Sequence, residues 1–156
     1  MKSLLLFFVL LAGVCLAQTP PKPPVGVPAD AKFFQGKWYR VYLEKGLTWH
    51  RAKAKCQQLG GQLLTVSDAS TWTFAQTLTK GPILWIGATD EETTGLWKWI
   101  DGSPLSFTAW EPGQPDNAKG IQHYAVMNKA GKWDDLQKEV KSGPFEVMGF
   151  ICEWKK

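Results

Sequence analysis

Hydrophobic residues recur along the chain with two different periods. Residues 37–43 are aromatic and β-branched, which is typical of a strand. The next segment has its apolar side chains at helical spacing, at Trp49, Ala52, Cys56 and Leu59. Thr48 can cap this helix and Gly60-Gly61 ends it. A second short helix is predicted over residues 70–78, because Gly81-Pro82 stops it.

The pattern then changes to short runs typical of strands. They are separated by Gly, Pro, Asp and Asn and cover residues 83–88, 96–100, 123–128 and 148–154. Asp101-Gly102 predicts a turn. The long stretch 103–122 has no regular period, and loops of that length in a compact domain are usually functional. We therefore expect an α+β fold with its chemistry in this loop.

The first residues resemble a targeting signal. A basic start is followed by an apolar run over residues 4–11 and by small residues up to Ala17, which predicts a secretory signal peptide at residues 1–17. The run is too short to span a bilayer, so we expect a secreted, extracellular protein without membrane insertion; a retained anchor is the alternative. Residues 18–32 are rich in proline and predict an extended tether, which leaves residues 33–156 as the globular domain.

Composition narrows the classes of protein. With 44% hydrophobic and 21% charged residues the chain can bury a core, which excludes a wholly disordered, collagenous or coiled-coil protein. The net charge is +4, but the basic residues are scattered, so no nucleic-acid partner is expected. Neither heptads nor spare cysteines are present after cleavage, so any homo-oligomer should be non-covalent.

Cysteine usage predicts one disulfide. Cleavage after Ala17 removes Cys15 and leaves Cys56 and Cys152, an even number in an oxidising compartment. A bond between them would close a loop of 96 residues and stabilise the fold by about 4.5 kcal/mol on the chain-entropy model. Two free thiols or an intermolecular bridge are the alternatives.

Two short motifs carry oxygen ligands. Gln114 and Asp116 flank Pro115 in the long loop, and Asp134 and Asp135 follow later in the chain. Calcium takes six to eight oxygen ligands, which carboxylates and carboxamides supply. Each motif alone could be an ordinary solvated turn or a plain loop proline; together they favour a calcium site.

These motifs resemble those of the C-type lectin-like domain family, from about Phe34 to Lys156. Residues 114–116 resemble its galactose-type calcium motif and residues 133–135 its second calcium motif. Residues 85–88 and 149–153 resemble its core and closing strands, whose cysteine pairs with that of the first helix. The resemblance implies two helices, small antiparallel sheets, a long calcium-binding loop and a cis bond before Pro115.

The resemblance also implies a function. It predicts a secreted, calcium-dependent lectin of galactose-type specificity that recognises glycans, including those of microbial surfaces. Sugar hydroxyls would fill open positions on the ion and hydrogen-bond to its ligands. The implied calcium ligands are Gln114, Asp116, Gln122, Asp134 and Asp135. The implied sugar contacts are Gln114, Asp116 and Asp134.

The chain departs from the family pattern in several places. Gln122 stands where a further glutamate is usual and Asp134 where asparagine is common, so the carboxylate charge of the site stays at −3. Tyr124 replaces a cysteine of the second disulfide. The auxiliary calcium site is reduced to Asp90, which predicts one calcium ion per chain. Residues 117–120 lack the tryptophan that stacks on the sugar.

Two other classes of function remain open. A calcium-independent relative would bind a protein, ice or mineral surface through the same face. An enzyme would need a nucleophile near His50 or His123, and none stands in a recognisable motif, so no catalytic residues are assigned.

Overall fold

The computed structural model describes residues 20–140 and 142–155, and the expected signal peptide lies outside this part. The helices are α1 (Trp49–Gln58) and α2 (Ala69–Thr77), with a short 3₁₀ turn η1 (Ala118–Gly120). The strands are β1 (Lys32–Phe34), β2 (Lys37–Leu43), β3 (Gln62–Leu63), β4 (Ile83–Thr89), β5 (Lys98–Trp99), β6 (Tyr124–Met127), β7 (Trp133–Leu136) and β8 (Val147–Lys155).

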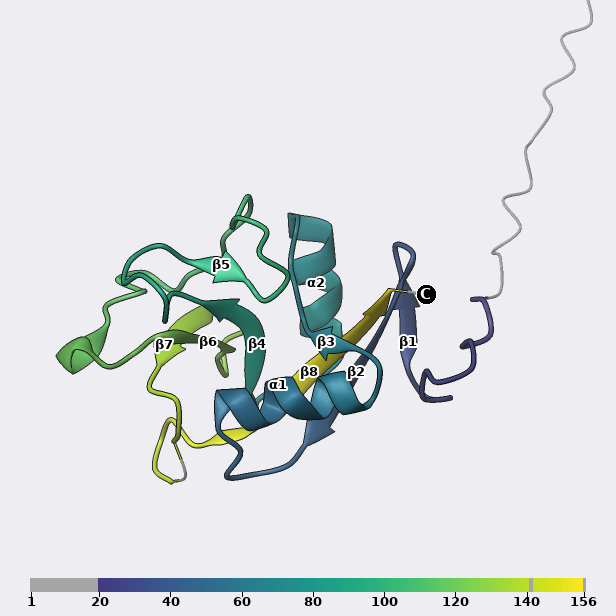
Figure 1. Cartoon of the computed structure of the whole chain (residues 1–156), viewed down its shortest axis with the longest axis horizontal. Helices are drawn as coiled ribbons and strands as arrows, with labels where there is room; N and C mark the ends of the chain where they lie inside the picture. The colour runs from purple at the N-terminus through teal and green to yellow at the C-terminus, as the bar shows by residue number, and fades with distance from the viewer. Residues whose placement is uncertain (1–19, 141, 156) are drawn as a thin grey trace, which may run out of the picture.

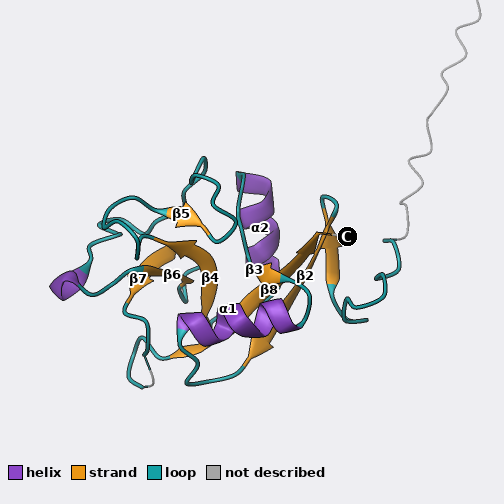
Figure 2. Cartoon of the chain, viewed as in Figure 1, coloured by secondary structure: helices purple, strands orange, loops and turns teal. Residues whose placement is uncertain are grey.

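The strands form one twisted sheet that both helices flank (Figures 1 and 2). Its order is β1-β2-β8-β4-β6-β7, with β3 on β8 and β5 on β4. The pair β2–β8 is antiparallel and joins the two ends of the domain, whereas β4 and β8 run parallel. Gly149 permits the close approach of β8 to β2, because a Cβ there would lie 1.9 Å from the Tyr42 carbonyl oxygen. The predicted α+β class is confirmed.

Both helices begin at side-chain caps. The Thr48 hydroxyl accepts a hydrogen bond from the Arg51 N–H (3.2 Å), as the sequence predicts. Asp68 caps α2 by accepting from two backbone N–H groups of its first turn, each at 2.9 Å. Three of the four predicted apolar positions of α1 are buried, whereas Leu59, at the C-cap, is 39% exposed.

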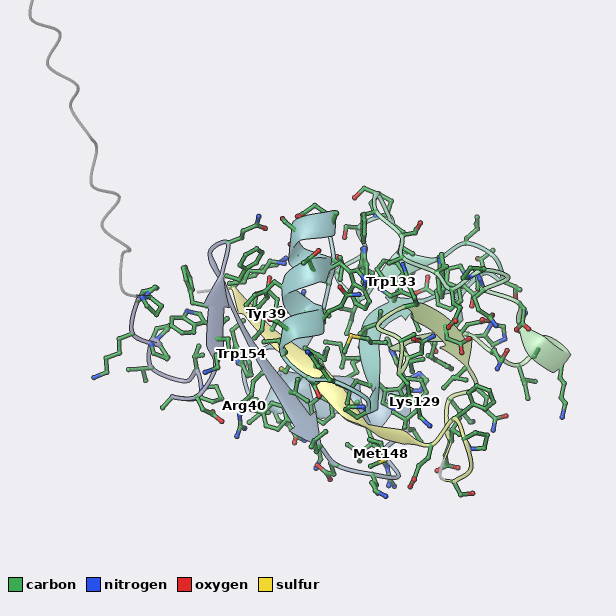
Figure 3. The ribbon with its side chains drawn as sticks, turned by 180° about the vertical axis from the view of Figure 1, so that it is seen from behind. Tyr39, Arg40, Lys129, Trp133, Met148 and Trp154 are labelled. Atoms are coloured by element: carbon green, nitrogen blue, oxygen red, sulfur yellow. The ribbon has the colours of Figure 1, made fainter. Side chains whose placement is uncertain are left out.

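Tryptophan fills much of the core. Trp133 is fully buried and meets four aromatic rings edge-on, those of Trp72, Trp99, Phe107 and Trp110. It is labelled in Figure 3, where Tyr39 and Trp154 lie along the β2–β8 pair. Trp133 begins β7, so the core ring system anchors the strand that carries the two expected acidic ligands.

The proline-rich segment is not wholly a free tether. Val27 and Ala31 are buried in the core cluster, and Asp30 forms an ion pair with Arg40 at 2.9 Å. Backbone hydrogen bonds from Val27 to Pro24 and from Ala31 to Pro28 shape the segment into turns. The core therefore reaches back to Val27, earlier than the expected boundary at residue 33.

None of the helices in the described part is long and apolar enough to cross a membrane.

The two cysteines meet in the core as free thiols. Cys56 on α1 and Cys152 on β8 are both fully buried, and the covalent bond expected from the sequence is not formed in this structure. Burial, and then the adjoining Cys152, raises the pKa of the Cys56 thiol. The oxidation of these two thiols to a disulfide stays a prediction.

Candidate functional site

Gln114 and Asp116 lie in the part of the long loop that packs against β7. The Gln114–Pro115 bond is cis, as the resemblance implied. The Gln114 Oε1 atom accepts a hydrogen bond from the Asp116 N–H at 2.9 Å. The carboxamide thus lies over the backbone of the residue whose carboxylate is the second expected ligand.

Asp135 fastens this loop to β7. Its carboxylate is buried and accepts from the Asp116 N–H (3.0 Å) and the Asn117 N–H (2.8 Å). Burial raises the pKa of Asp135, although these two N–H groups act in the opposite direction. The structure therefore brings the two sequence motifs together through a side chain of one and the backbone of the other.

Gln122 closes the far side of the loop. Its Oε1 atom accepts from the Ala118 N–H at 2.7 Å, and its own N–H donates to the Asn117 side-chain oxygen at 3.0 Å. The Ala118 N–H also reaches Asp116 Oδ1 at 3.0 Å. Asn117 and Lys119 have positive φ angles of 43° and 60°, so the loop turns sharply around η1.

Asp134 precedes Asp135 on β7 and, unlike Asp135, is only partly buried. It lines a cavity of about 250 Å³ together with Glu111, Asn128 and Phe145. Burial, then the negative charges of Asp135, Asp116 and Glu111, raises the pKa of Asp134 to about 6. The nearby carboxylates repel one another, and a bound cation would relieve that repulsion.

The donor set has the chemistry that calcium prefers. The five candidate residues supply only carboxylate and carboxamide oxygens, without sulfur or imidazole. Within residues 20–140 and 142–155, however, no group of three or more His, Cys, Asp or Glu side chains is close enough to hold a metal ion. A calcium site here therefore needs the carboxamides of Gln114 and Gln122. Because each such oxygen has two lone pairs, its hydrogen bond to the loop leaves one for a metal.

The carboxylates at the position of the family's auxiliary calcium site are hydrogen-bonded to protein groups. Asp90 is 2% exposed, and its two oxygens meet His123 Nδ1 (2.9 Å) and the Gly95 N–H (2.6 Å). Glu91 meets His50 Nε2 at 2.9 Å and accepts from the Tyr124 hydroxyl at 2.7 Å. Both histidines thus pair with carboxylates that hold α1, β4 and β6 together.

Two residues beside Asp134 were missed by the sequence analysis. Phe145, on the loop between β7 and β8, is 53% exposed and lines the cavity that Asp134 and Glu111 share. The second residue is Glu111. Neither Phe145 nor Glu111 belongs to a motif, and their proximity to Asp134 depends on the folding of two separate loops. The signal in the sequence was an aromatic residue, Phe145, in an otherwise mostly polar loop.

Comparison with known proteins settles the family. The Lectin C-type domain model matches residues 45–153, well over half of the chain. The chain belongs to the C-type lectin domain family. Its fold, expected from the sequence motifs, is thereby confirmed, and the family is generally non-enzymatic.

Relatives of this C-type lectin domain include sugar-binding and other proteins. A hepatic lectin of Gallus gallus is 33% identical over 107 residues, which cover 67% of this chain and 51% of the relative. The chain therefore spans about half the length of that lectin. The carbohydrate-recognition domain of the mouse scavenger receptor C-type lectin is 35% identical, with a TM-score of 0.73 over 82% of this chain and 95% of its own. A calcium-independent type II antifreeze protein is 25% identical, with a TM-score of 0.71 over 82% and 93%.

Proposed function

We propose that this C-type lectin domain is a secreted, calcium-dependent lectin that binds glycans of the galactose type. The observation that carries the proposal is the meeting of the two motifs, in which Asp135 binds the backbone on the carboxyl side of Gln114–Pro115. It is supported by the crowding of Asp134 with other carboxylates.

The ion and its side-chain ligands would contact the sugar in different ways. Calcium, when bound, supplies coordination positions for two neighbouring sugar hydroxyls. Gln114 offers a carboxamide that can donate to a hydroxyl, whereas Asp116 offers a carboxylate that only accepts. The order of these two groups therefore selects the orientation of the sugar hydroxyls, and this order is the basis for proposing galactose.

Charge supports one ion. Asp116, Asp134 and Asp135 together carry −3, and Gln122 adds a ligand oxygen without charge. Calcium would reduce this local charge to −1. Because Asp135 and Gln122 also hold the loop backbone, metal binding and loop order should be coupled.

The proposed biological setting follows from the N-terminal sequence and the relatives. A signal peptide would place the domain outside the cell, where host and microbial glycans are accessible. Secretion, binding to microbial glycans and non-covalent oligomer formation belong to this proposal.

A second candidate is a calcium-independent binding module. It is favoured by the uncharged Gln122, whose side-chain oxygen already accepts from the Ala118 N–H. The similarity to an antifreeze protein described as calcium-independent supports the same alternative.

Chromatography on immobilised galactose separates the candidates. The wild-type protein should be retained more strongly in calcium than in a chelator. Asp116→Ala should lose this calcium-dependent retention, since it removes a metal ligand and a hydrogen-bond acceptor, whereas Asp30→Ala, an exposed control, should keep it. Equal retention of the wild-type protein in calcium and in chelator would contradict calcium dependence.

A further inference from the structure

A second cavity lies away from the candidate calcium site, at the start of the long loop. It has a volume of about 270 Å³ and lies between the paired ends of β2 and β8 and the loop after β5. We call it the β2–β8 end cavity; the residues that matter here are Lys37, Trp99, Asp101, Ser103, Ser106 and Lys155. In Figure 1 the C-terminal end of β8 lies at the opposite side of the domain from η1.

Two lysines face each other across the strands that form this cavity. Lys37 and Lys155 are direct partners in the β2–β8 register, a like-charge arrangement that is ordinarily unfavourable. Each has its own carboxylate: Lys37 binds the buried Glu153 at 3.1 Å, and Lys155 binds Asp101 at 3.2 Å. The four charged groups are thereby fixed in place, and their sum is zero.

The hydrogen-bonding groups of Lys37 and Glu153 are already paired with protein groups, so a ligand must bind other residues of the cavity. Glu153 accepts from Lys37, Gln62 and Thr65. Lys37 donates to both Glu153 carboxylate oxygens, at 3.1 and 3.3 Å, and to the Thr65 hydroxyl, at 3.2 Å, which accounts for its three protons. Lys37, which lines the cavity, is therefore held by the buried Glu153 and by Thr65 and is not free to contact a ligand.

The opposite wall retains donors and acceptors. Asp101 accepts from the N–H and hydroxyl of Ser103, at 3.1 and 2.5 Å. Although burial opposes it, hydrogen bonding by Ser103 and Lys155 keeps the pKa of Asp101 below its ordinary value, so the carboxylate is ionised at neutral pH. Lys155 is 56% exposed at its side chain, and the Ser106 hydroxyl reaches its partner carbonyl only at 3.4 Å.

This arrangement suits a neutral polyhydroxylated ligand. A sugar hydroxyl can donate to Asp101 while a neighbouring hydroxyl accepts from Lys155 or Ser106. Each ammonium is already compensated by a carboxylate, which disfavours a simple anion. The volume is just below the range of about 300–1,000 Å³ for drug-sized ligands, so it fits one monosaccharide unit. Pro104 adds exposed apolar surface to the lining.

We propose that the β2–β8 end cavity binds one neutral sugar unit directly, without a metal ion. The choice of a sugar rests on the lectin function proposed above, but the cavity shares no residue with the candidate calcium site. A single chain would then have two separate sugar sites and could link two glycans as a monomer.

The test is an amide chemical-shift titration in the presence of EDTA. Methyl β-galactoside and methyl α-mannoside are added separately to the full secreted protein. At least one should shift the amide signals of Ser103, Ser106 and Lys155 and leave those of residues 116–118 in place. No shift at these three amides with either glycoside up to about 100 mM, a limit well beyond ordinary weak binding, would overturn the proposal.

Matched variants assign the effect. Ser103→Ala and Lys155→Gln should each weaken the glycoside about tenfold, whereas Lys45→Gln, which removes another surface ion pair, should not. Equal affinity in all three variants would contradict the site, and the spectra report whether each variant is folded. Asp116→Ala should keep metal-free binding even if it abolishes calcium-dependent binding, so the two proposals can fail separately. Inorganic sulfate that shifts the same amides when neither glycoside does would show an anion site instead.

Discussion

The Asp134 carboxylate should destabilise the calcium-free domain at neutral pH, so Asp134→Asn should stabilise it. The substitution keeps the shape and one ligand oxygen but removes the charge that burial and three neighbouring carboxylates oppose. A pKa of about 6 against an ordinary 3.8 corresponds to about 3 kcal/mol. Because the side chain is only half buried, solvent screening reduces the expected gain to about 1 kcal/mol.

The sign follows from proton binding. The folded state holds the Asp134 proton more tightly than the unfolded chain, so the wild-type free energy of unfolding, relative to the variant, falls as pH rises from about 4 to about 6. Urea denaturation in EDTA should therefore show nearly equal stabilities at pH 4 and a more stable variant at pH 8. The control Asp30→Asn, at a carboxylate that is paired with Arg40 rather than surrounded by other carboxylates, should not become more stable than wild type at pH 8. A difference for Asp134→Asn that does not change with pH, or a less stable variant at pH 8, would refute the reasoning.

Four further outcomes are expected. Peptide mapping of the purified protein should find Cys56 joined to Cys152, and reduction should lower the free energy of unfolding by up to about 4.5 kcal/mol; a free thiol would contradict this. Calorimetry should detect one calcium ion per chain, and two tightly bound ions would show that the auxiliary site is functional. The double substitution Gln114→Glu with Asp116→Asn should keep calcium but shift preference from galactose toward mannose about tenfold, as measured by competition binding. Phe145→Ala should weaken sugar binding about fivefold with calcium affinity unchanged, because an apolar contact beside Asp134 is lost; unchanged sugar affinity would exclude that contact.

Local signals predicted the long elements of the fold. Thr48 and the apolar spacing after it predicted α1, and continuous β-branched and aromatic runs predicted β2, β4 and β8. The strands β1 and β3 are only two or three residues long, and they exist because β2 and β8 offer backbone partners. Burial of Val27 could not be predicted, since prolines indicate a local conformation but not the surface on which the segment packs.

The candidate site was predictable as a set of ligands but not as a geometry. The motifs named Asp116 and Asp135, and the structure joins them through a backbone N–H rather than through side chains alone. The proximity of Phe145 and Glu111 to Asp134 depends on the path of two loops without periodicity. Sequence spacing carries no information about that path, and so the aromatic neighbour was missed.

The most direct test of the central claim is a titration of the purified protein with galactose, in calcium and in EDTA. In a Lys155→Gln background, which weakens metal-free binding at the β2–β8 end cavity, we expect binding heat in calcium that is largely lost in EDTA. Adding Asp116→Ala to this background should leave only the weak metal-free binding under both conditions. Galactose binding by the Lys155→Gln protein that is equally strong in calcium and in EDTA would contradict a calcium-dependent sugar site in the long loop.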